Sequence, residues 1–504
     1  MNNVNREYDR VRTTSFGNII DVIGATTTGA SKYQHIIDQF RPEVVFVEEA
    51  GQVLESHVAA LLVPSVKHLI MIGDHKQLRP SINNHDLSMD NKRTPHRFDE
   101  SAFERLVKKG VPHETLLLQH RQHPELADLI RPVPYAGLED SEAARTQRGV
   151  VLGMGRGCDR LFWWTHEHEE DRQDDKEATS QSNREEANMA AELAIYLQRQ
   201  QEEADVVVLT TYLGQLRLIK QLLLNRPRTQ IVLNERDEDD LQKLNGDDDD
   251  GRGETGKAVQ FQLCKQKLRL ATVDNFQGEE ADYVVLSLVR SNKRNNIGFL
   301  RTTNRVTVAL SRARRGLYIV GNSTCFDGTS AFWTETIANL RSADRVSATV
   351  QVQCQRHPST LTDVSTALDF RSRCMDGGCS LPCEARLSCG HCCPKQCHPD
   401  DREHTIARYL CPKPCVRRCA AEGHTCDGIC GQHAERCPPC AAPVIRLFEM
   451  CGHECKQQCC DPEECTEVIT HRFPCGHEVC NTFPCGYTCA LDSYSHTYVH
   501  ARHA

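Results

Sequence analysis

The sequence lacks long apolar runs: no stretch approaches the roughly 18 consecutive apolar residues that a membrane-spanning helix needs. We therefore expect no membrane partner. The first residues, MNNVNREYDRVRTT (1–14), are polar and lack the apolar centre of a signal peptide. Positive charge is in deficit, because 60 Lys and Arg face 69 Asp and Glu and the net charge is −9. This balance excludes a uniformly basic nucleic-acid-binding coat but allows a local basic groove.

Cysteine is almost absent from the first 350 residues, where only Cys158, Cys264 and Cys325 occur among the 27 cysteines of the chain. All the others fall between Cys354 and Cys489. A chain without an export signal keeps its thiols reduced, so cysteines interleaved with histidines indicate metal ligands and not disulfides. We expect Zn²⁺ in this part of the chain.

Apolar periodicity predicts an α/β fold before the cysteine-rich part. Short apolar runs predict buried parallel strands at 19–26, 43–50, 68–75, 204–212, 268–274, 281–289 and 316–322, and helical spacing predicts helices at 53–63 and 184–200. Alternating strands and helices predict a doubly wound sheet with ligands at the carboxyl ends of its strands. The acidic segments 167–177 and 235–256 are expected to be solvated loops, and 346–353 a linker.

Several polar motifs follow these predicted strands. VEEAGQ (47–52) carries the paired carboxylates Glu48 and Glu49, which could hold Mg²⁺ and polarise a water molecule. The other motifs supply Gln77 in GDHKQLRP, Arg121 in LLLQHRQHP, Gln277, Gly278, Glu279 and Arg290 in the block 273–291, and Arg312 in the block 304–322. Each alone could be an exposed polar residue. Their order along the chain makes coincidence a poor explanation.

In this order the motifs resemble those of the superfamily 1 helicases, specifically the group that contains the nonsense-mediated-decay RNA helicase. The resemblance covers residues 19–325 and implies tandem RecA-like (P-loop NTPase) domains, with ATP between them: a truncated first domain over 1–110 and a second over 111–345. It implies that Glu48 binds Mg²⁺ and that Glu49 is the catalytic base. It also implies that Gln77 is the coupling glutamine, which senses the γ-phosphate. It further implies the following roles: Arg121 and Arg312 at the γ-phosphate, Gln277, Gly278 and Glu279 near phosphate and ribose, His120 on adenine, and Thr26, Thr27, Lys32 and Arg290 on the nucleic-acid strand.

The chain departs from the helicase pattern in three places. Glu48 stands where the family usually has Asp, and His120 where it often has Tyr. The phosphate-binding loop of the family precedes the VIGATTTGASKY block (22–33), and only about twenty residues precede that block here. We expect the chain to be the C-terminal portion of a longer helicase, with essentially no ATPase activity alone. Gly251 to Lys257 imitates the loop, but Ala258 replaces the Mg²⁺-binding Ser or Thr and no strand precedes it.

The cysteine-rich part, residues 354–490, repeats a C-G-H-x-C-x3-C unit or near variants and precedes a short tail, 491–504. Thiolates and imidazoles in fours suit closed tetrahedral Zn²⁺ sites. Spacing alone does not pair the ligands with ions, and Cys392 and Cys460 are candidates for spare thiols. The predicted ligands are Cys389, His391, Cys393, Cys397, His398, Cys411, Cys415, Cys419, His424, Cys426, Cys430, His433, Cys437, Cys440, Cys451, His453, Cys455, Cys459, Cys475, His477, Cys480, Cys485 and Cys489.

These units resemble the NFX-type zinc finger. A helicase joined to such fingers resembles the NFX-type zinc-finger-containing helicases, which include the fungal helicase required for RNA interference. This resemblance implies ATP, Mg²⁺ and Zn²⁺ as cofactors, single-stranded RNA (DNA not excluded) as a partner, and an RNA-directed RNA polymerase complex with silencing factors. It implies a nuclear role in RNA-mediated silencing and heterochromatin, with the cytoplasm as the alternative compartment. The alternative function is a zinc-dependent nucleic-acid- or protein-binding module whose RecA part is inactive.

Overall fold

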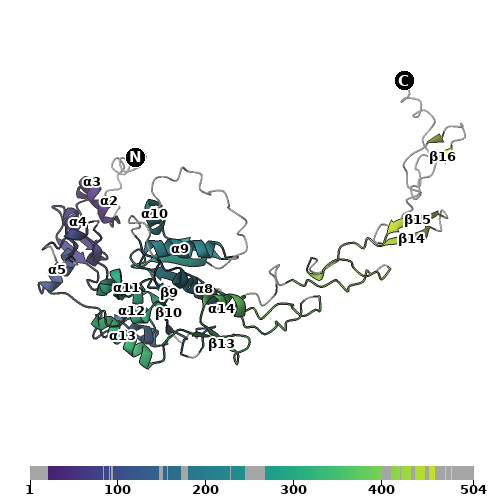
Figure 1. The fold of residues 1–504 in the computed structure, drawn as a ribbon. Coiled ribbons are helices and arrows are strands. Elements are labelled where there is room, and N and C mark those ends of the chain that lie inside the picture. The colour runs from purple at the N-terminus through teal and green to yellow at the C-terminus, as the bar shows by residue number, and fades with distance from the viewer. Residues whose placement is uncertain are drawn as a thin grey trace, which may run out of the picture. The chain divides into compact units, whose positions relative to one another are not determined.

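The computed structural model describes residues 21–459 apart from 83, 90, 92–94, 147–150, 156, 172–179, 202, 227–228, 245–266, 388, 400–403, 405–409, 420–421, 433–436 and 449–452, together with 471–472 and 478–479. The chain divides into two compact units, Met1–Ser380 and Leu381–Ala504. Figure 1 shows helices and strands alternating in the first unit, whereas the second is built of short strands and loops. The predicted α/β class with a Cys/His-rich region is confirmed.

The first unit begins with a small α/β element whose two strands, β1 and β2, are parallel and pair Val44 with His68. The strands at 43–50 and 68–75 and the helix at 53–63 are confirmed, whereas residues 21–26 form no strand. Phe46 and Ile72 are 65% and 54% exposed, because β1 and β2 pair only with each other in the described residues. The elements are α2 (Thr27–Lys32), α3 (Gln34–Phe40), β1 (Val44–Val47), the 3-10 helix η2 (Ala50–Gln52), α4 (Glu55–Leu61), β2 (His68–Met71), η3 (His85–Leu87) and α5 (Ala102–Lys108).

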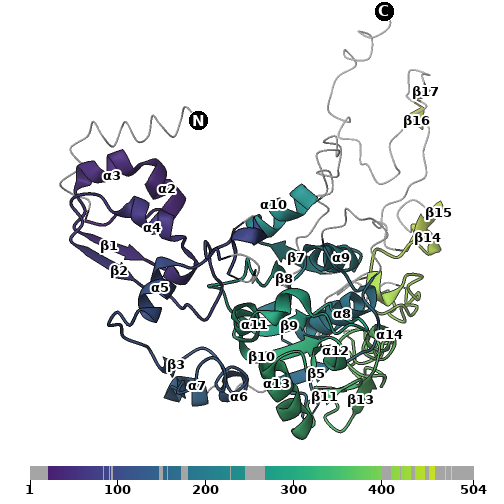
Figure 2. The ribbon, with the colours of Figure 1, turned by 60° about the vertical axis from the view of Figure 1, so that its left-hand side comes forward.

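A seven-stranded parallel sheet forms the centre of the first unit, in the order β11-β5-β10-β9-β6-β8-β7 (Figure 2). The strands predicted at 204–212, 268–274, 281–289 and 316–322 are β6, β8, β9 and β10. The sheet strands are β5 (Leu161–Trp164), β6 (Val206–Thr210), β7 (Gln230–Leu233), β8 (Lys267–Thr272), β9 (Ala281–Ser287), β10 (Ala313–Val320) and β11 (Val346–Ser347). A separate parallel pair joins β3 (Leu118–Gln119) to β4 (Glu139–Asp140).

Two hydrophobic cores lie on opposite faces of this sheet, because successive side chains of a strand point to opposite sides. Along β6, Val206 and Val208 belong to one core, and Val207 and Leu209 to the other. The first core also contains residues of α8 (Arg184–Gln200) and α9 (Leu213–Leu224). The second contains residues of α6 (Pro124–Ala127), α11 (Thr303–Leu310), α12 (Ser323–Phe326) and α13 (Ala331–Ser342). The remaining short helices before α11 are α7 (Glu142–Thr146) and the 3-10 helix η4 (Gly298–Arg301).

The helix predicted at 184–200 has those bounds in α8. Its start is fixed by Asn183, whose side chain accepts a hydrogen bond from the Glu186 N–H, as a helix N-cap does. A cap of this kind satisfies one of the backbone N–H groups that the first turn leaves without a partner.

The acidic segment expected as a loop contains a helix, α10 (Glu235–Leu244), in its described part. Asp237 of α10 is fully buried and accepts hydrogen bonds from Thr272 Oγ1 at 2.7 Å and from Asn275 Nδ2 at 2.8 Å. Burial raises the pKa of its carboxyl. The loop prediction is therefore wrong for 235–244, because a buried carboxylate and the apolar Leu241 anchor this segment.

Residues 346–353, expected as a linker, form β11 and β12 (Val350–Gln353). β12 pairs antiparallel with β13 (Leu361–Val364), and α14 (Ala367–Arg373) follows. Val350, Val352 and Phe370 join the core beneath α8. The segment is ordered because its alternate apolar residues pack on that core.

The second unit consists of hairpin-like turns of chain. Isolated bridges pair Pro382 with Gln396 and Pro414 with Ile429, and a third hairpin pairs β14 (Pro443–Phe448) with β15 (His453–Gln458). The other elements are the 3-10 helix η6 (Cys430–Gln432), β16 (His471–Arg472) and β17 (Glu478–Val479). Across the described residues of both units, we find no helix with the length and apolar character needed to cross a membrane.

Candidate functional site

The loop that follows β1 carries the two adjacent carboxylates. Glu48 and Glu49 are both exposed, and Glu49 has the left-handed backbone conformation, with φ at 48°. The strand therefore ends in a sharp turn that separates the directions of the two side chains. Gln277 Nε2, from the loop after β8, donates a hydrogen bond to Glu49 Oε2 at 3.1 Å.

Two glycines bring the loops after β1 and β2 into backbone contact. A Cβ on Gly73 would lie 2.8 Å from Ala50 N, and a Cβ on Gly51 would lie 2.7 Å from Asp74 O. Ala50 N also donates to Ile72 O at 2.9 Å. Only glycine allows this approach, which places the carboxylates beside the GDHKQ loop.

Gln77 and Arg312 meet although they lie far apart in the sequence. Arg312 Nη2 donates to Gln77 Oε1 at 3.1 Å, and Gln77 Nε2 donates to Asp74 Oδ2 at 3.0 Å. The Arg312 guanidinium is also held by the carbonyl oxygens of Val308 and Glu279, at 3.1 and 3.2 Å. Its position is thus fixed by α11, by the loop after β8 and by the loop after β2.

Arg121 lies near Arg312 and is held by different partners. Its Nε donates to Glu280 Oε2 at 2.7 Å. Burial, followed by repulsion from the Arg121 charge, lowers the pKa of Arg312 to about 10. Arg312 is still protonated at neutral pH, so the site holds two guanidinium charges whose mutual repulsion an anion such as phosphate would relieve.

The loop after β8 joins the same group of side chains. Gln277 Oε1 accepts a hydrogen bond from Leu78 N at 3.3 Å, in addition to the bond from its amide to Glu49. Gly278 is exposed with φ at 83°, a conformation that favours glycine. Glu279 forms an ion pair with Arg269. The structure therefore brings Glu49, Gln77, Gln277 and Arg312 together.

The other predicted helicase residues are placed differently. Glu48 and His120 are exposed, and Thr26 is the N-cap of α2, where its Oγ1 accepts from Gly29 N at 3.1 Å. Thr27 is half-buried in α2 and Lys32 is exposed at its end. Arg290 is buried, and its Nε donates to Glu170 Oε2 at 2.8 Å.

Three residues that the sequence analysis did not single out support the site. Asp74 accepts from Lys76 N at 2.9 Å and from Gln77, and the Tyr135 hydroxyl donates to the same carboxylate. Asn304 Nδ2 donates to the carbonyl oxygen of His75 at 3.0 Å. The GDHKQ motif already contained Asp74, whereas no spacing or periodicity marks Tyr135 or Asn304.

Cysteine and histidine side chains gather into five groups in the described residues, and the ligand atoms of each group lie within 4.8 Å of one another. Cys415 Sγ and Cys437 Sγ are 3.6 Å apart, and Cys419 Sγ and Cys459 Sγ 3.4 Å. Tetrahedral Zn²⁺, with bonds of about 2.0 Å to nitrogen and 2.3 Å to sulfur, separates its ligand atoms by about 3.5–3.8 Å. A disulfide needs about 2.05 Å. The donor sets and their spacing therefore fit zinc.

The groups combine ligands from different repeats. They are Cys354, His357 and Cys379 in the first unit; and in the second Cys383, Cys393, His398 and His404; Cys389, His391, Cys411 and Cys430; Cys419, His424, Cys440 and Cys459; and Cys415, Cys426 and Cys437. Cys411 and Cys415, four residues apart, belong to different groups. In extended chain, four residues span about 13 Å, which is too far for one ion.

Some predicted ligands lie outside these groups. Cys455 is buried but belongs to none of them, and Cys392 is exposed, in keeping with a spare thiol. Cys354, His357, Cys379, Cys383 and His404 were not among the predicted ligands. His433, Cys451, Cys475, His477, Cys480, Cys485 and Cys489, the side chain of His453, and the Gly251–Lys257 segment lie outside the described residues.

Comparison with known proteins accounts for both parts of the chain. Residues 98–324 and 2–85 each match a family model described as an AAA domain. Human NFX1-type zinc finger-containing protein 1 is 37% identical over 460 residues, which cover 90% of this chain and 21% of that protein. The chain is homologous to NFX1-type zinc finger-containing protein 1 and to superfamily 1 helicases.

Two further relatives match about two thirds of the chain. Helicase required for RNAi-mediated heterochromatin assembly 1 of Schizosaccharomyces pombe is 35% identical over 65% of this chain and 28% of that protein. Regulator of nonsense transcripts 1 of Dictyostelium discoideum is 30% identical over 64% of this chain and 21% of that protein. The chain thus contains superfamily 1 helicase-like domains and spans between a fifth and a third of the length of these three relatives.

The packing of the two strand-end loops generates a prediction. Replacing Gly73 with Ala places a methyl group against two backbone nitrogens and should lower the free energy of unfolding of the first unit by about 1–3 kcal/mol, as overpacking does. Thermal unfolding followed by circular dichroism measures this loss. Gly24→Ala is the matched control, because nothing lies within 4 Å of the added Cβ. Equal unfolding midpoints for the two variants would contradict the close approach.

Proposed function

We propose that the protein is an ATP-dependent RNA helicase or translocase of superfamily 1. The observation that carries this proposal is the buried Arg312 guanidinium, bonded to Gln77 and lying near Arg121. Two fixed guanidinium groups beside exposed carboxylates suit a triphosphate with its metal ion. A basic patch for nucleic acid alone would not require a buried arginine that contacts a glutamine from another loop.

Each residue then has a distinct task. Bound Mg²⁺·ATP supplies a phosphoryl group that can be transferred to water, and Glu48 holds the metal ion. Glu49 accepts the proton of the attacking water, and its left-handed turn directs its carboxylate toward the loop after β8. Arg121 and Arg312 neutralise the charge that develops on the phosphoryl oxygens.

Gln77 is suited to couple this chemistry to movement. It bonds both to Arg312 and to Asp74, whose carboxylate also accepts the Tyr135 hydroxyl. A change in the position of Arg312 on phosphate release would therefore reach the loop after β2 directly. Gln277, bonded to Glu49 and to Leu78 N, forms a second link between the same loops.

The segment 290–315 is proposed as the RNA contact of the second domain, because it contains eight Lys and Arg and no acidic residue. The structure supports this assignment most strongly at Lys293, Arg294 and Arg301, whose side chains are exposed. Lys293 Nζ forms an exposed ion pair with Glu169 Oε1 at 3.5 Å, and exposed ion pairs contribute little free energy. Arg290, bonded to Glu170, would instead keep the segment in place.

The cysteine-rich unit is proposed to bind several Zn²⁺ ions as an interaction module. The name of the S. pombe relative supports a nuclear role in RNAi-mediated heterochromatin assembly. An RNA-directed RNA polymerase complex and silencing factors are proposed as partners on the resemblance to that family alone. The alternative is a zinc-dependent nucleic-acid- or protein-binding module with an inactive RecA part. ATPase measurements on a chain extended to include a phosphate-binding loop separate the two.

The first test concerns hydrolysis by a chain extended at its N-terminus to include a phosphate-binding loop. Glu49→Gln should abolish turnover but spare ATP binding, because the amide cannot accept a proton, a loss of about 10²–10⁴ in rate. Arg312→Ala should lower the rate by about 10³–10⁵. Steady-state ATPase assays and nucleotide binding measure both effects.

Lys257→Ala is the control for this test, since the Gly251–Lys257 segment should play no part in hydrolysis. Near-normal ATPase in Glu49→Gln would refute the assignment of the base. Activity that depends on Lys257 would refute the rejection of that segment as a phosphate-binding loop.

The second test concerns RNA. Combining Lys293→Glu, Arg294→Glu and Arg301→Glu should weaken binding of single-stranded RNA and reduce the slope of log affinity against log salt by about 2, since each lost phosphate contact contributes about 0.7. Fluorescence anisotropy at several salt concentrations measures the slope. The control combines Arg217→Glu, Lys220→Glu and Lys243→Glu on α9 and α10, with the same change in charge. If both variants bind equally well, the groove lies elsewhere.

A further inference from the structure

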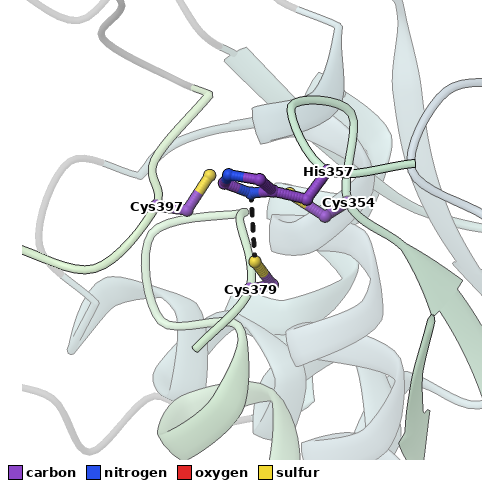
Figure 3. Close-up of side chains that lie close together, drawn as sticks. All are labelled: Cys354, His357, Cys379 and Cys397. Atoms are coloured by element: carbon purple, nitrogen blue, oxygen red, sulfur yellow. Dashed lines mark hydrogen bonds between the residues drawn. The ribbon is translucent and has the colours of Figure 1, made fainter. Parts of the chain in front are cut away.

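One group of metal-binding side chains lies outside the C-G-H-x-C repeats. Cys354 and His357 belong to the turn between β12 and β13, and Cys379 follows α14. Figure 3 shows these three side chains of the first unit directed toward one another. Neither the repeat pattern nor the helicase motifs include them.

The distances within this group fit a tetrahedral ion. His357 Nδ1 lies 3.6 Å from Cys354 Sγ and 3.4 Å from Cys379 Sγ (Figure 3). Nitrogen and sulfur bound to one Zn²⁺ lie about 3.5 Å apart. Cys354 and Cys379 are 3% and 2% exposed, and His357 is half-buried. Two buried thiols that share one imidazole nitrogen are better explained as metal ligands than as hydrogen-bonding groups, because thiols are weak donors and acceptors.

The backbone around the ligands is fixed by contacts of its own. The turn closes with Cys354 N donating to Thr360 O at 3.2 Å, and β12 is held by Gln353 N donating to Gly153 O at 2.9 Å. The segment before Cys379 is held by Gln200 Nε2, which donates to Gly377 O at 2.6 Å. Gln355 Nε2 donates to the carbonyl oxygen of the same Gln200 at 2.8 Å. The end of α8 therefore positions both ligand-bearing segments, as a preorganised site requires.

Thiolate and imidazole groups are the ligands that Zn²⁺ prefers in structural sites. We propose that Cys354, His357 and Cys379 bind one Zn²⁺ ion that stabilises the β12–β13 hairpin and the segment after α14 against α8. It joins segments distant in sequence and reduces the freedom of the unfolded chain between them. This site goes beyond the proposed helicase activity and is distinct from the zinc-binding repeats.

The test compares zinc content and unfolding of the full chain. Cys379→Ser should bind about one ion less per chain than the wild type, since an ion that loses one of its thiolate ligands is held poorly. Its thermal midpoint should also fall. Cys325→Ser is the matched control: Cys325 is a buried cysteine of the other core that belongs to none of the metal groups, so its loss affects packing but not zinc. Elemental analysis of purified protein measures the ions.

A second variant keeps the proposal testable if Cys379→Ser does not fold. His357→Cys preserves the number of ligands, so zinc content should stay at the wild-type value. In the Co²⁺-substituted protein this variant should show stronger thiolate-to-cobalt charge-transfer absorption, because one more thiolate binds the ion. A purely structural histidine would leave that absorption unchanged, and such a result would overturn the proposal.

The zinc content of a further variant distinguishes this site from the proposed zinc-binding repeats. Cys430→Ser should remove zinc from the group of Cys389, His391 and Cys411. If Cys430→Ser loses zinc and Cys379→Ser does not, the present site is refuted and the repeats stand. A wild-type chain with less than one zinc ion would refute both.

Discussion

The buried guanidinium of Arg312 is the contact on which the candidate nucleotide site depends. Its side chain is 1% exposed, and a buried charge is costly unless hydrogen bonds surround it. Val308, Glu279 and Gln77 supply those bonds from α11, the loop after β8 and the loop after β2. The three elements must therefore stay together, and the positions of Glu49 and Gln277 follow from theirs.

The same arrangement explains why the site needs specific residue types at only a few positions. The carboxyl ends of parallel strands lie along one edge of a sheet, so polar loops that follow them are brought together without long insertions. Gly51 and Gly73 permit the closest approach between two of these loops. The large sheet positions β8 and its following loop through ladders to β6 and β7. The site thus depends on rigid strands and on glycine backbone, whereas the carboxylates of Glu48 and Glu49 are exposed and accessible to a ligand.

The cysteine-rich unit follows a different physical rule. It has little apolar core, and the sulfur and imidazole groups replace it. Because extended chain separates neighbouring ligands of a C-x3-C pair, each ion must gather its ligands across a hairpin or between hairpins. Cys389 and His391 therefore share a group with Cys411 and Cys430 of the next repeat. Stability in such a unit comes from links between repeats and not from each repeat alone.

The sequence by itself determined four strands of the large sheet (β6, β8, β9 and β10), the bounds of α8, the order of the helicase motifs and the metal-binding character of the last part, because all of these are local patterns of hydrophobicity and residue type. Tertiary structure alone decided that Gln77 meets Arg312, that Arg290 faces Glu170, that Asp237 makes an acidic segment helical, and which thiols share a group. Those outcomes join residues distant in sequence. No local pattern encodes them, since the hydrogen bonds and coordination geometry that select each partner exist only after the sheet and the hairpins have formed.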